Sequence, residues 1–147
     1  MFDLPGVVSD ASAHLAGQDV GSRIDLVAGD MFRDEPPRGA DVYILSNVIH
    51  DWDDEQATAI LARCRSAAES DSRILLVTEL LPDRVADAPA TIANDFSMLM
   101  LTGGRERTRA ECERLLEDAG LRLHEVKPLD VRNGRQENWA LLVARPA

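Results

Sequence analysis

The sequence predicts a single α/β domain, residues 1–147, built on a mostly parallel sheet. Three observations support this prediction. Short runs of Val, Ile and Leu, such as RILLVT at 73–78, are typical of parallel strands that are covered on both faces. Stretches with helical periodicity alternate with these runs, which favours a parallel sheet. The chain has 147 residues, of which 45% are hydrophobic, so it can bury a sizeable core.

The first half of the chain contains two predicted helices and two predicted strands. Pro5 suits the first turn of a helix, because the N–H that proline lacks has no partner there. Asp53 suits the N-cap of the second helix, with Gln56 three residues later in the capping-box position. The expected ranges are a helix at 5–18, a strand at 24–28, a loop at 33–39, a strand at 41–46 and a helix at 53–69.

The second half contains two more helices and three strands. Thr108 and Glu111 form a capping-box pattern, and Gly120 suits the position after a helix. Asn133-Gly134 is a hairpin signal, so the last strand is expected to be antiparallel and to lie at one edge of the sheet. The expected ranges are a strand at 73–78, a polar loop at 83–89, a helix at 91–101, a helix from 108 to 119–120, and strands at 121–126 and 138–144.

The charge balance argues against nucleic acid binding. The chain carries 26 Asp and Glu against 16 Lys and Arg, for a net charge of -10. Contacts to a phosphate backbone need basic patches instead. No charged and apolar leader opens the chain, and no apolar run reaches the ~20 residues of a membrane span. We therefore expect a soluble cytoplasmic protein with no nucleic acid or membrane partner.

The cysteines and acids favour neither a disulfide nor a metal site. Cys64 and Cys112 lie far apart in segments that are expected to be helical, and no C-x-x-C spacing is present. We interpret them as small buried thiols. A metal site at residues 50–54 is the weaker alternative, because the acids there are better used at a helix N-terminus.

His50 is the sharpest candidate for a catalytic role. It follows the apolar run at 42–45, at the carboxyl edge of the predicted sheet, where α/β enzymes bind their ligands. An imidazole with an ordinary pKa of ~6.5 can remove a proton near neutral pH if a partner fixes its tautomer. Glu79, at a strand end, and Glu106, after a glycine pair, are the available partners. The alternative is that His50 is one polar residue at a capped helix start.

Two further acids follow predicted strands. Asp3 comes after a short apolar stub and is placed either to hydrogen-bond a ribose diol or to cap the next helix. Asp30 follows a glycine that lets the backbone turn, so its carboxylate could accept a hydrogen bond from an adenine amino group. Met31 or Phe32 would then cover a ring face. The alternative is a polar loop residue beside two core side chains.

Seven segments, covering nearly the whole chain, resemble a known enzyme family. In chain order they are FDLPGVV, RIDLVAGDMF, DVYILSNVIHDWDDEQATAIL, ILLVTELLP, DFSMLMLTGGRERT, LLEDAGL and ENWALLVARPA. Together they resemble the small-molecule O-methyltransferases that use S-adenosylmethionine. This family includes the plant caffeate and flavonoid type and actinobacterial enzymes of natural-product biosynthesis. HDWDDE together with GGRERT is a specific combination.

The resemblance implies a Rossmann-like methyltransferase domain and a role for each matching residue. His50 would be the general base that removes the acceptor's hydroxyl proton, flanked and oriented by Glu79 and Glu106. The other implied positions are Asp3 at the cofactor ribose, Asp30, Met31 and Phe32 at the adenine, Ser46 where the plant type has a lysine that contacts the cofactor, and Asp51 and Met98 at the acceptor.

Two parts of the family's organisation are not among these 147 residues. One is the glycine-rich signature on the first strand and its loop, upstream of FDLPG, and the other is a helical domain that dimerises. We therefore expect a truncated domain with exposed strand edges, which promote self-association. One hypothesis is the carboxy-terminal part of an enzyme that methylates a phenolic or polyketide-type hydroxyl. The alternative is a short non-catalytic homologue that binds a ligand or a partner chain.

Overall fold

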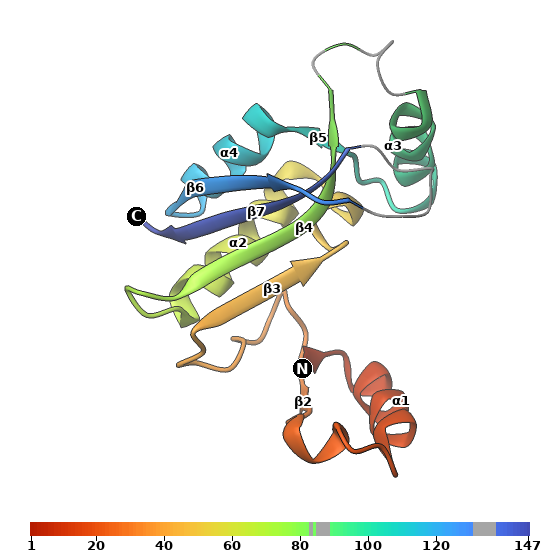
Figure 1. Ribbon diagram of the computed structural model, residues 1–147, viewed down its shortest axis with the longest axis vertical. Coiled ribbons are helices and arrows are strands. Elements are labelled where there is room, and N and C mark those ends of the chain that lie inside the picture. The colour runs from red at the N-terminus through yellow and green to blue at the C-terminus, as the bar shows by residue number, and fades with distance from the viewer. Residues whose placement is uncertain (83, 85–88, 131–137) are drawn as a thin grey trace.

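The computed structural model describes residues 1–82, 84, 89–130 and 138–147, and its strands form two sheets (Figure 1). The smaller sheet pairs β1 with β2, which α1 and the 3₁₀ turn η1 connect. The larger sheet contains the other five strands. The strands are β1 (Phe2–Asp3), β2 (Val27–Ala28), β3 (Val42–Ser46), β4 (Arg73–Leu81), β5 (Arg107–Thr108), β6 (Leu121–Pro128) and β7 (Trp139–Pro146). The helices are α1 (Pro5–Leu15), η1 (Gly21–Arg23), η2 (Ile49–Asp51), α2 (Asp54–Ala67), α3 (Pro89–Leu101) and α4 (Arg109–Asp118).

Four strands of the larger sheet run in one direction. Neighbours follow the order β3-β4-β7-β6, and β5 pairs with the end of β4. β4 is parallel to β3 and β5, whereas β7 is antiparallel to both β4 and β6. The described residues therefore confirm an α/β fold with a mostly parallel sheet.

The position of the antiparallel strand differs from the prediction. β7 is antiparallel as expected, but it lies between β4 and β6, so β6 forms the edge. The side chains give the reason. β7 carries an almost continuous apolar run, with Leu142 and Ala144 fully buried, as an interior strand requires. β6 alternates apolar residues with Arg122, Glu125 and Lys127, which are exposed charges of the kind that protect a sheet edge from association.

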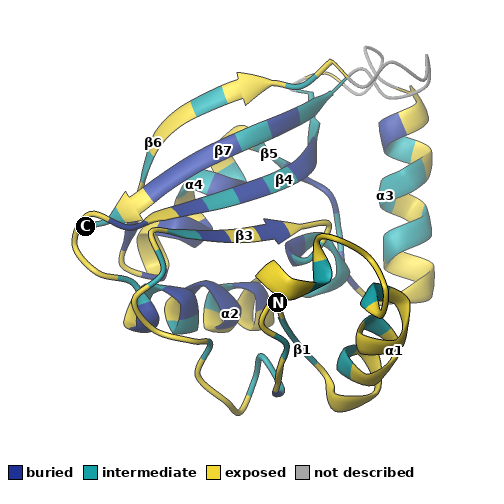
Figure 2. Cartoon of the chain, turned by 60° about the horizontal axis from the view of Figure 1, so that its bottom comes forward, coloured by how far each residue is buried: buried dark blue, intermediate teal, exposed yellow. Residues whose placement is uncertain are grey.

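The core lies between the larger sheet and the pair α2 and α4, which pack on one of its faces (Figure 2). Leu61 of α2, Leu116 of α4, Ile74 of β4 and Leu142 of β7 are all fully buried there. The opposite face is less covered, since Ile44 of β3 is 64% exposed. The prediction that strands are covered on both faces is therefore wrong for β3, because no helix of the described chain packs over Ile44.

The helix boundaries largely follow the capping patterns. Asp53 caps α2 by accepting the N–H of Gln56 at 2.8 Å. Thr108 and Glu111 form the full reciprocal capping box at the start of α4. Gly120 follows α4 with a φ of 73°, a conformation that suits glycine. The main errors are near the amino terminus, where α1 ends three residues early and β2 is only two residues long.

Some expected segments fall outside the description. The polar loop at 83–89 lies largely outside it, and the turn at Asn133-Gly134 lies entirely outside it. Among the helices that the structure describes, none has the length and apolar character needed to cross a membrane.

The two cysteines are free and buried, as predicted. Burial raises the pKa of the Cys64 and Cys112 thiols to about 11 each. Both thiols therefore stay protonated and poorly reactive near neutral pH.

Candidate active site

His50 lies in η2, directly after β3, where the sequence predicts a catalytic residue. The chain leaves β3 through Asn47, whose φ of 55° is a left-handed conformation that asparagine adopts more readily than most residues. The N–H of Asn47 donates to the carbonyl of Val77 in β4 at 3.0 Å. This turn holds His50 at the carboxyl edge of the sheet, with 14% of its side chain exposed.

Glu106 is the direct partner of His50. Its Oε1 lies 2.9 Å from Nδ1 of His50, and the Glu106 side chain is completely buried. The second oxygen, Oε2, has no hydrogen-bond partner among the described residues, so the negative charge is only partly compensated there. The predicted pairing of these two residues is present in the structure.

The surroundings of His50 favour its protonated form. The hydrogen bond to Glu106 raises the pKa of His50 above 6.5; burial opposes this, the charges of Glu106 and Asp51 add to it, and Arg107 lowers it. When His50 is neutral, Nδ1–H donates to Glu106 and leaves Nε2 as the free acceptor. Asp51 Oδ1 lies 3.8 Å from Nε2, on the side of the ring opposite Nδ1.

Glu79 does not bind His50 directly. It is 3% exposed, and its carboxylate accepts hydrogen bonds from Thr91 Oγ1 at 2.7 Å and Asn94 Nδ2 at 3.4 Å, both on α3. Asn94 Nδ2 also donates to Glu106 Oε1 at 2.7 Å. Among the described residues, Glu79 is therefore connected to His50 through Asn94 and Glu106, whereas the sequence predicted that it flanks the imidazole.

Sequence reasoning missed Thr91 and Asn94. Both are polar residues on the largely apolar helix α3, and Thr91 is only 1% exposed. Asp95, next to Asn94, accepts the backbone N–H of Glu106 at 2.8 Å. Buried polar side chains on such a helix need hydrogen-bond partners, and this was the available signal.

The GGRERT segment packs against the turn that carries His50 and forms hydrogen bonds to it. The N–H of Arg105 donates to the His50 carbonyl at 2.9 Å. Gly104 packs so closely that a Cβ on it would overlap the His50 carbonyl and the backbone of Asp51 and Trp52. Arg107, which is 3% exposed, donates to the carbonyls of the same turn. The motif was assigned only Glu106 from the sequence, but the structure uses several of its members.

The predicted cofactor residues lie at strand ends. Asp3 is the last residue of β1, and Asp30 follows the end of β2. Because the two strands are parallel, both carboxylates lie at the same edge of the small sheet. Asp3 Oδ1 accepts the N–H of Leu4 at 2.8 Å; Leu4, not Asp3, is at the N-cap of α1, so the capping alternative for Asp3 is wrong. Ser46 is exposed at the end of β3.

Asp30 and its neighbours also stabilise their own loop. Asp30 Oδ1 accepts the N–H of Phe32 at 2.8 Å, and Arg33 lies 3.6 Å from its other oxygen. Phe32 packs edge-on against Trp52 with ring centroids 4.7 Å apart. Met31 is half-buried against the core. The structural and ligand-binding interpretations of these residues are therefore compatible.

The predicted acceptor residues come from two elements. Asp51 is 38% exposed in η2, beside His50. Met98 is half-buried on α3, the helix that also carries Thr91 and Asn94. The structure places both on elements that hold or contact the His50–Glu106 pair.

The O-methyltransferase domain family matches residues 1–122 of the chain. The chain belongs to this family. Mitomycin biosynthesis 6-O-methyltransferase of Streptomyces lavendulae is 38% identical over 128 residues, which are 87% of this chain and 36% of that protein. The resemblance found in the sequence motifs is thereby confirmed.

Solved O-methyltransferase structures share the fold of this chain. LaPhzM superposes with a TM-score of 0.90 at 36% identity, covering 100% of this chain and 42% of the other. NcsB1 from neocarzinostatin biosynthesis, in complex with S-adenosyl-L-homocysteine and 1,4-dihydroxy-2-naphthoic acid, superposes with a TM-score of 0.84 at 33% identity, covering 99% of this chain and 41% of the other. The chain thus spans less than half the length of these relatives and forms part of their fold.

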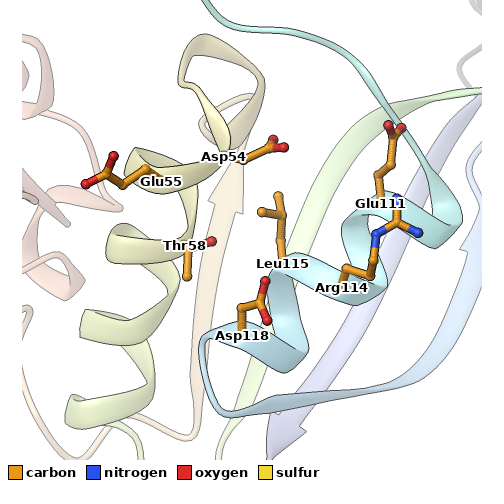
Figure 3. A pocket seen from close by; sticks show the side chains of 7 residues that line it. All are labelled: Asp54, Glu55, Thr58, Glu111, Arg114, Leu115 and Asp118. Atoms are coloured by element: carbon orange, nitrogen blue, oxygen red, sulfur yellow. The ribbon is translucent and has the colours of Figure 1, made fainter.

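Two of the hollows formed by the described residues lie beside the elements of this site. A groove of about 350 Å³ separates β1 from β3 and is lined by Phe2, Met31 and Ile44 among others. A second one, of about 380 Å³, lies between α2 and α4 and is lined by Asp54, Glu55, Thr58, Glu111, Arg114, Leu115 and Asp118 (Figure 3). His50 lines neither hollow, and the groove beside β3 includes one predicted cofactor residue, Met31.

Two acids that follow His50 in the sequence, Asp53 and Asp54, have structural roles. Asp53 caps α2, and Asp54 binds Arg107 at 2.8 Å. Over the described ranges, no three His, Cys, Asp or Glu side chains are grouped so that they could hold a metal ion. These contacts account for the acid-rich segment through helix capping and ion pairing.

Proposed function

We propose that the protein containing this chain transfers a methyl group from S-adenosylmethionine to a hydroxyl of a small aromatic molecule, with His50 as the general base. The observation that carries this proposal is the 2.9 Å contact between His50 Nδ1 and the buried carboxylate of Glu106. It leaves Nε2 as the proton acceptor and prepares Glu106 to stabilise the imidazolium that forms.

The residues at the edge of the small sheet fit the proposed cofactor. The carboxylates of Asp3 and Asp30 can accept hydrogen bonds from a ribose diol and an adenine amino group, and Met31 can cover a ring face. Bound S-adenosylmethionine supplies a methyl group on a sulfonium, which is already a strong electrophile. NcsB1 has been crystallised with this cofactor and its demethylated product, which supports the same choice here.

Catalysis then depends on alignment and proton removal by this chain's own residues. His50 Nε2 would take the hydroxyl proton, and the acceptor oxygen would receive the methyl group that S-adenosylmethionine supplies when bound, with S-adenosylhomocysteine as the leaving product. Alignment of two reactants contributes up to ~7–11 kcal/mol in favourable cases, and a positioned base adds about 10²–10⁴-fold. A phenol with a pKa of ~10 is a suitable acceptor, because only partial proton transfer is needed.

The acceptor class is inferred from the names and the bound ligand of two relatives. The mitomycin enzyme and NcsB1, with its dihydroxynaphthoic acid, support a phenolic or polyketide-type substrate. Glu79 would contribute through Asn94 and Glu106, and Met98 and Asp51 would line the acceptor side. We also propose that Ser46 borders the cofactor and that the whole protein is a cytoplasmic homodimer.

Methyl transfer assays on the full-length gene product test this function. Labelled S-adenosylmethionine is incubated with a panel of phenols and hydroxynaphthoic acids, and label in the organic phase is counted. Transfer to a hydroxyl supports the proposal. Tight cofactor binding by calorimetry without transfer to any hydroxyl in the panel would contradict the proposed acceptor class.

The free edge of β3 favours a second candidate, a non-catalytic module that binds a partner chain. Within the described residues nothing pairs with the outer edge of β3, and the groove of about 350 Å³ runs beside it. In the enzyme hypothesis a strand from the rest of the protein fills this position. Calorimetry with S-adenosylhomocysteine and size measurement on residues 1–147 separate the two, because tight cofactor binding by a monomer excludes the binding-module hypothesis.

A further inference from the structure

Arg107 is a buried arginine whose hydrogen bonds converge on the turn that carries His50. The Arg107 side chain is 2% exposed, so its charge depends on the protein for compensation. Nε and Nη2 lie 2.9 and 2.8 Å from Asp54 Oδ1. This pairing leaves the other guanidinium N–H groups free to donate to the backbone, and they bind carbonyls on either side of His50.

The guanidinium binds the residues immediately around the proposed base. Nη1 donates to the Ile49 carbonyl at 2.7 Å, and Nη2 donates to the Trp52 carbonyl at 2.8 Å. Within the turn, the N–H of Asp51 donates to the Val48 carbonyl at 3.2 Å. A 3₁₀ turn has poorer hydrogen-bond geometry than an α-helix, so donors from outside help to fix its shape.

Residues 105–107 therefore hold the turn at several points. The Arg105 N–H binds the His50 carbonyl, the Glu106 carboxylate binds the His50 ring, and the Arg107 guanidinium binds the flanking carbonyls. Glu106 directly precedes Arg107, which is the first residue of β5. Residues 105–107 thus hold both the His50 imidazole and the backbone of the turn that carries it.

We propose that Arg107 is a positioning residue for His50: its guanidinium fixes the backbone of the turn so that the imidazole stays aligned with Glu106 and the acceptor. This inference rests on the proposed role of His50 as the base. Arg107 itself touches neither substrate nor cofactor in this role. Lysine cannot replace it, because an ammonium group lacks the planar fork that reaches the carboxylate and both carbonyls together.

Kinetics of Arg107→Lys in the full-length protein test the proposal, with Arg109→Lys as the matched control. Arg109 is exposed two residues away. A displacement of ~1 Å in a catalytic group can cost about 10²-fold, so kcat should fall about 10- to 100-fold in Arg107→Lys. The KM for the cofactor and acceptor should change less than about threefold, and Arg109→Lys should match the wild type.

A double-mutant cycle with His50→Ala separates positioning from general structural damage. If Arg107 acts through His50, Arg107→Lys has no further effect on the residual rate of His50→Ala. An equal loss in both backgrounds would overturn the proposal, and so would a kcat for Arg107→Lys that matches Arg109→Lys.

The NMR titration of His50 provides a readout that does not depend on methyl transfer, so the proposal can be judged even if the proposed function fails. The charged groups facing His50 are Glu106, Asp51 and Arg107. Arg107→Lys keeps the charge, so a fall in the His50 pKa towards 6.5 reports a loosened bond to Glu106. An unchanged pKa overturns the proposal.

If Arg107→Lys does not fold, Asp54→Asn is the second variant, because it weakens the carboxylate that orients the guanidinium. Its control is Glu55→Gln, in the same first turn of α2. Asp54→Asn should lower kcat by about threefold and should also lower the His50 pKa. Equality with Glu55→Gln in both measurements overturns the proposal.

Discussion

Asn94 and His50 bind the same oxygen of Glu106. Asn94 Nδ2 lies 2.7 Å and His50 Nδ1 lies 2.9 Å from Glu106 Oε1. The helix α3 is therefore joined to the proposed base through one buried carboxylate. Asn94 also reaches Glu79, so a single amide lies between two buried acids. This relationship makes specific predictions for substitutions in the cluster.

Replacement of Asn94 by alanine should destabilise the fold. A hydrogen bond to a charged group contributes about 1.5–3 kcal/mol, and two carboxylates lose this donor together. We expect a loss of about 1–3 kcal/mol in the free energy of unfolding, measured by urea denaturation. Ser97→Ala is the control, because the Ser97 hydroxyl binds only the Ala93 carbonyl of its own helix. Equal effects of the two variants would contradict the role of Asn94.

Glu106→Gln should shift the pH profile of methyl transfer. The hydrogen bond to Glu106 is the main reason that the pKa of His50 lies above 6.5. The base acts when it is unprotonated, so the rate should rise as pH increases through the His50 pKa. The substitution removes the negative charge beside the imidazole, so this rising limb should move to lower pH while the maximal rate falls. The exposed Glu117→Gln is the control, and a limb that stays in place would contradict the pairing.

The raised pKa of His50 also predicts how stability depends on pH. The folded protein binds the His50 proton more tightly than the unfolded chain does, so protonation stabilises the fold. This contribution is complete below the unfolded pKa of ~6.5 and is lost as pH rises through the folded pKa. The stability difference between wild type and His50→Gln should therefore shrink from pH 5 to pH 9. A constant difference, or a larger one at high pH, would contradict the shift; exposed His124→Gln is the control.

Gly104→Ala should disrupt the site through the backbone. Its Cβ would overlap the His50 carbonyl, which cannot move without displacing the turn. Overpacking typically costs about 1–3 kcal/mol, and methyl transfer should fall with it. Gly103→Ala is the matched control, since Gly103 has open space around it and only its φ of 79° opposes alanine, at about 1–2 kcal/mol. Retained transfer in Gly104→Ala would show that this packing does not position His50.

Local patterns predicted the elements well wherever short-range physics decides them. The Asp53 N-cap sets the start of α2, the Thr108–Glu111 capping box sets the start of α4, and the strand-end position of His50 follows from the apolar run of β3. The place of β7 between β4 and β6 was missed, because neighbour choice is a long-range property. The exposed charges of β6 indicate an edge strand, and this signal would have corrected the prediction.

Within the site, the sequence offered both Glu79 and Glu106 as partners of His50, and the structure shows that Glu106 contacts the imidazole and Glu79 does not. Both glutamates are at predicted loop positions, so the sequence alone does not show which of them contacts His50. The difference arises from α3. Its residues Thr91 and Asn94 donate hydrogen bonds to the Glu79 carboxylate, which therefore points to α3 and not to the imidazole. The proposed role of Arg107 was hidden for a similar reason, since most of its partners are backbone carbonyls, which carry no sequence signal.

The most direct test of the central claim compares His50→Ala with His124→Ala in methyl transfer by the full-length protein. Loss of a positioned base should lower the maximal rate about 10²–10⁴-fold, while calorimetric affinity for S-adenosylhomocysteine stays unchanged. His124 is exposed on β6 and its replacement should leave the rate intact. A His50→Ala variant that transfers methyl groups as fast as the wild type would contradict the assignment of His50 as the base.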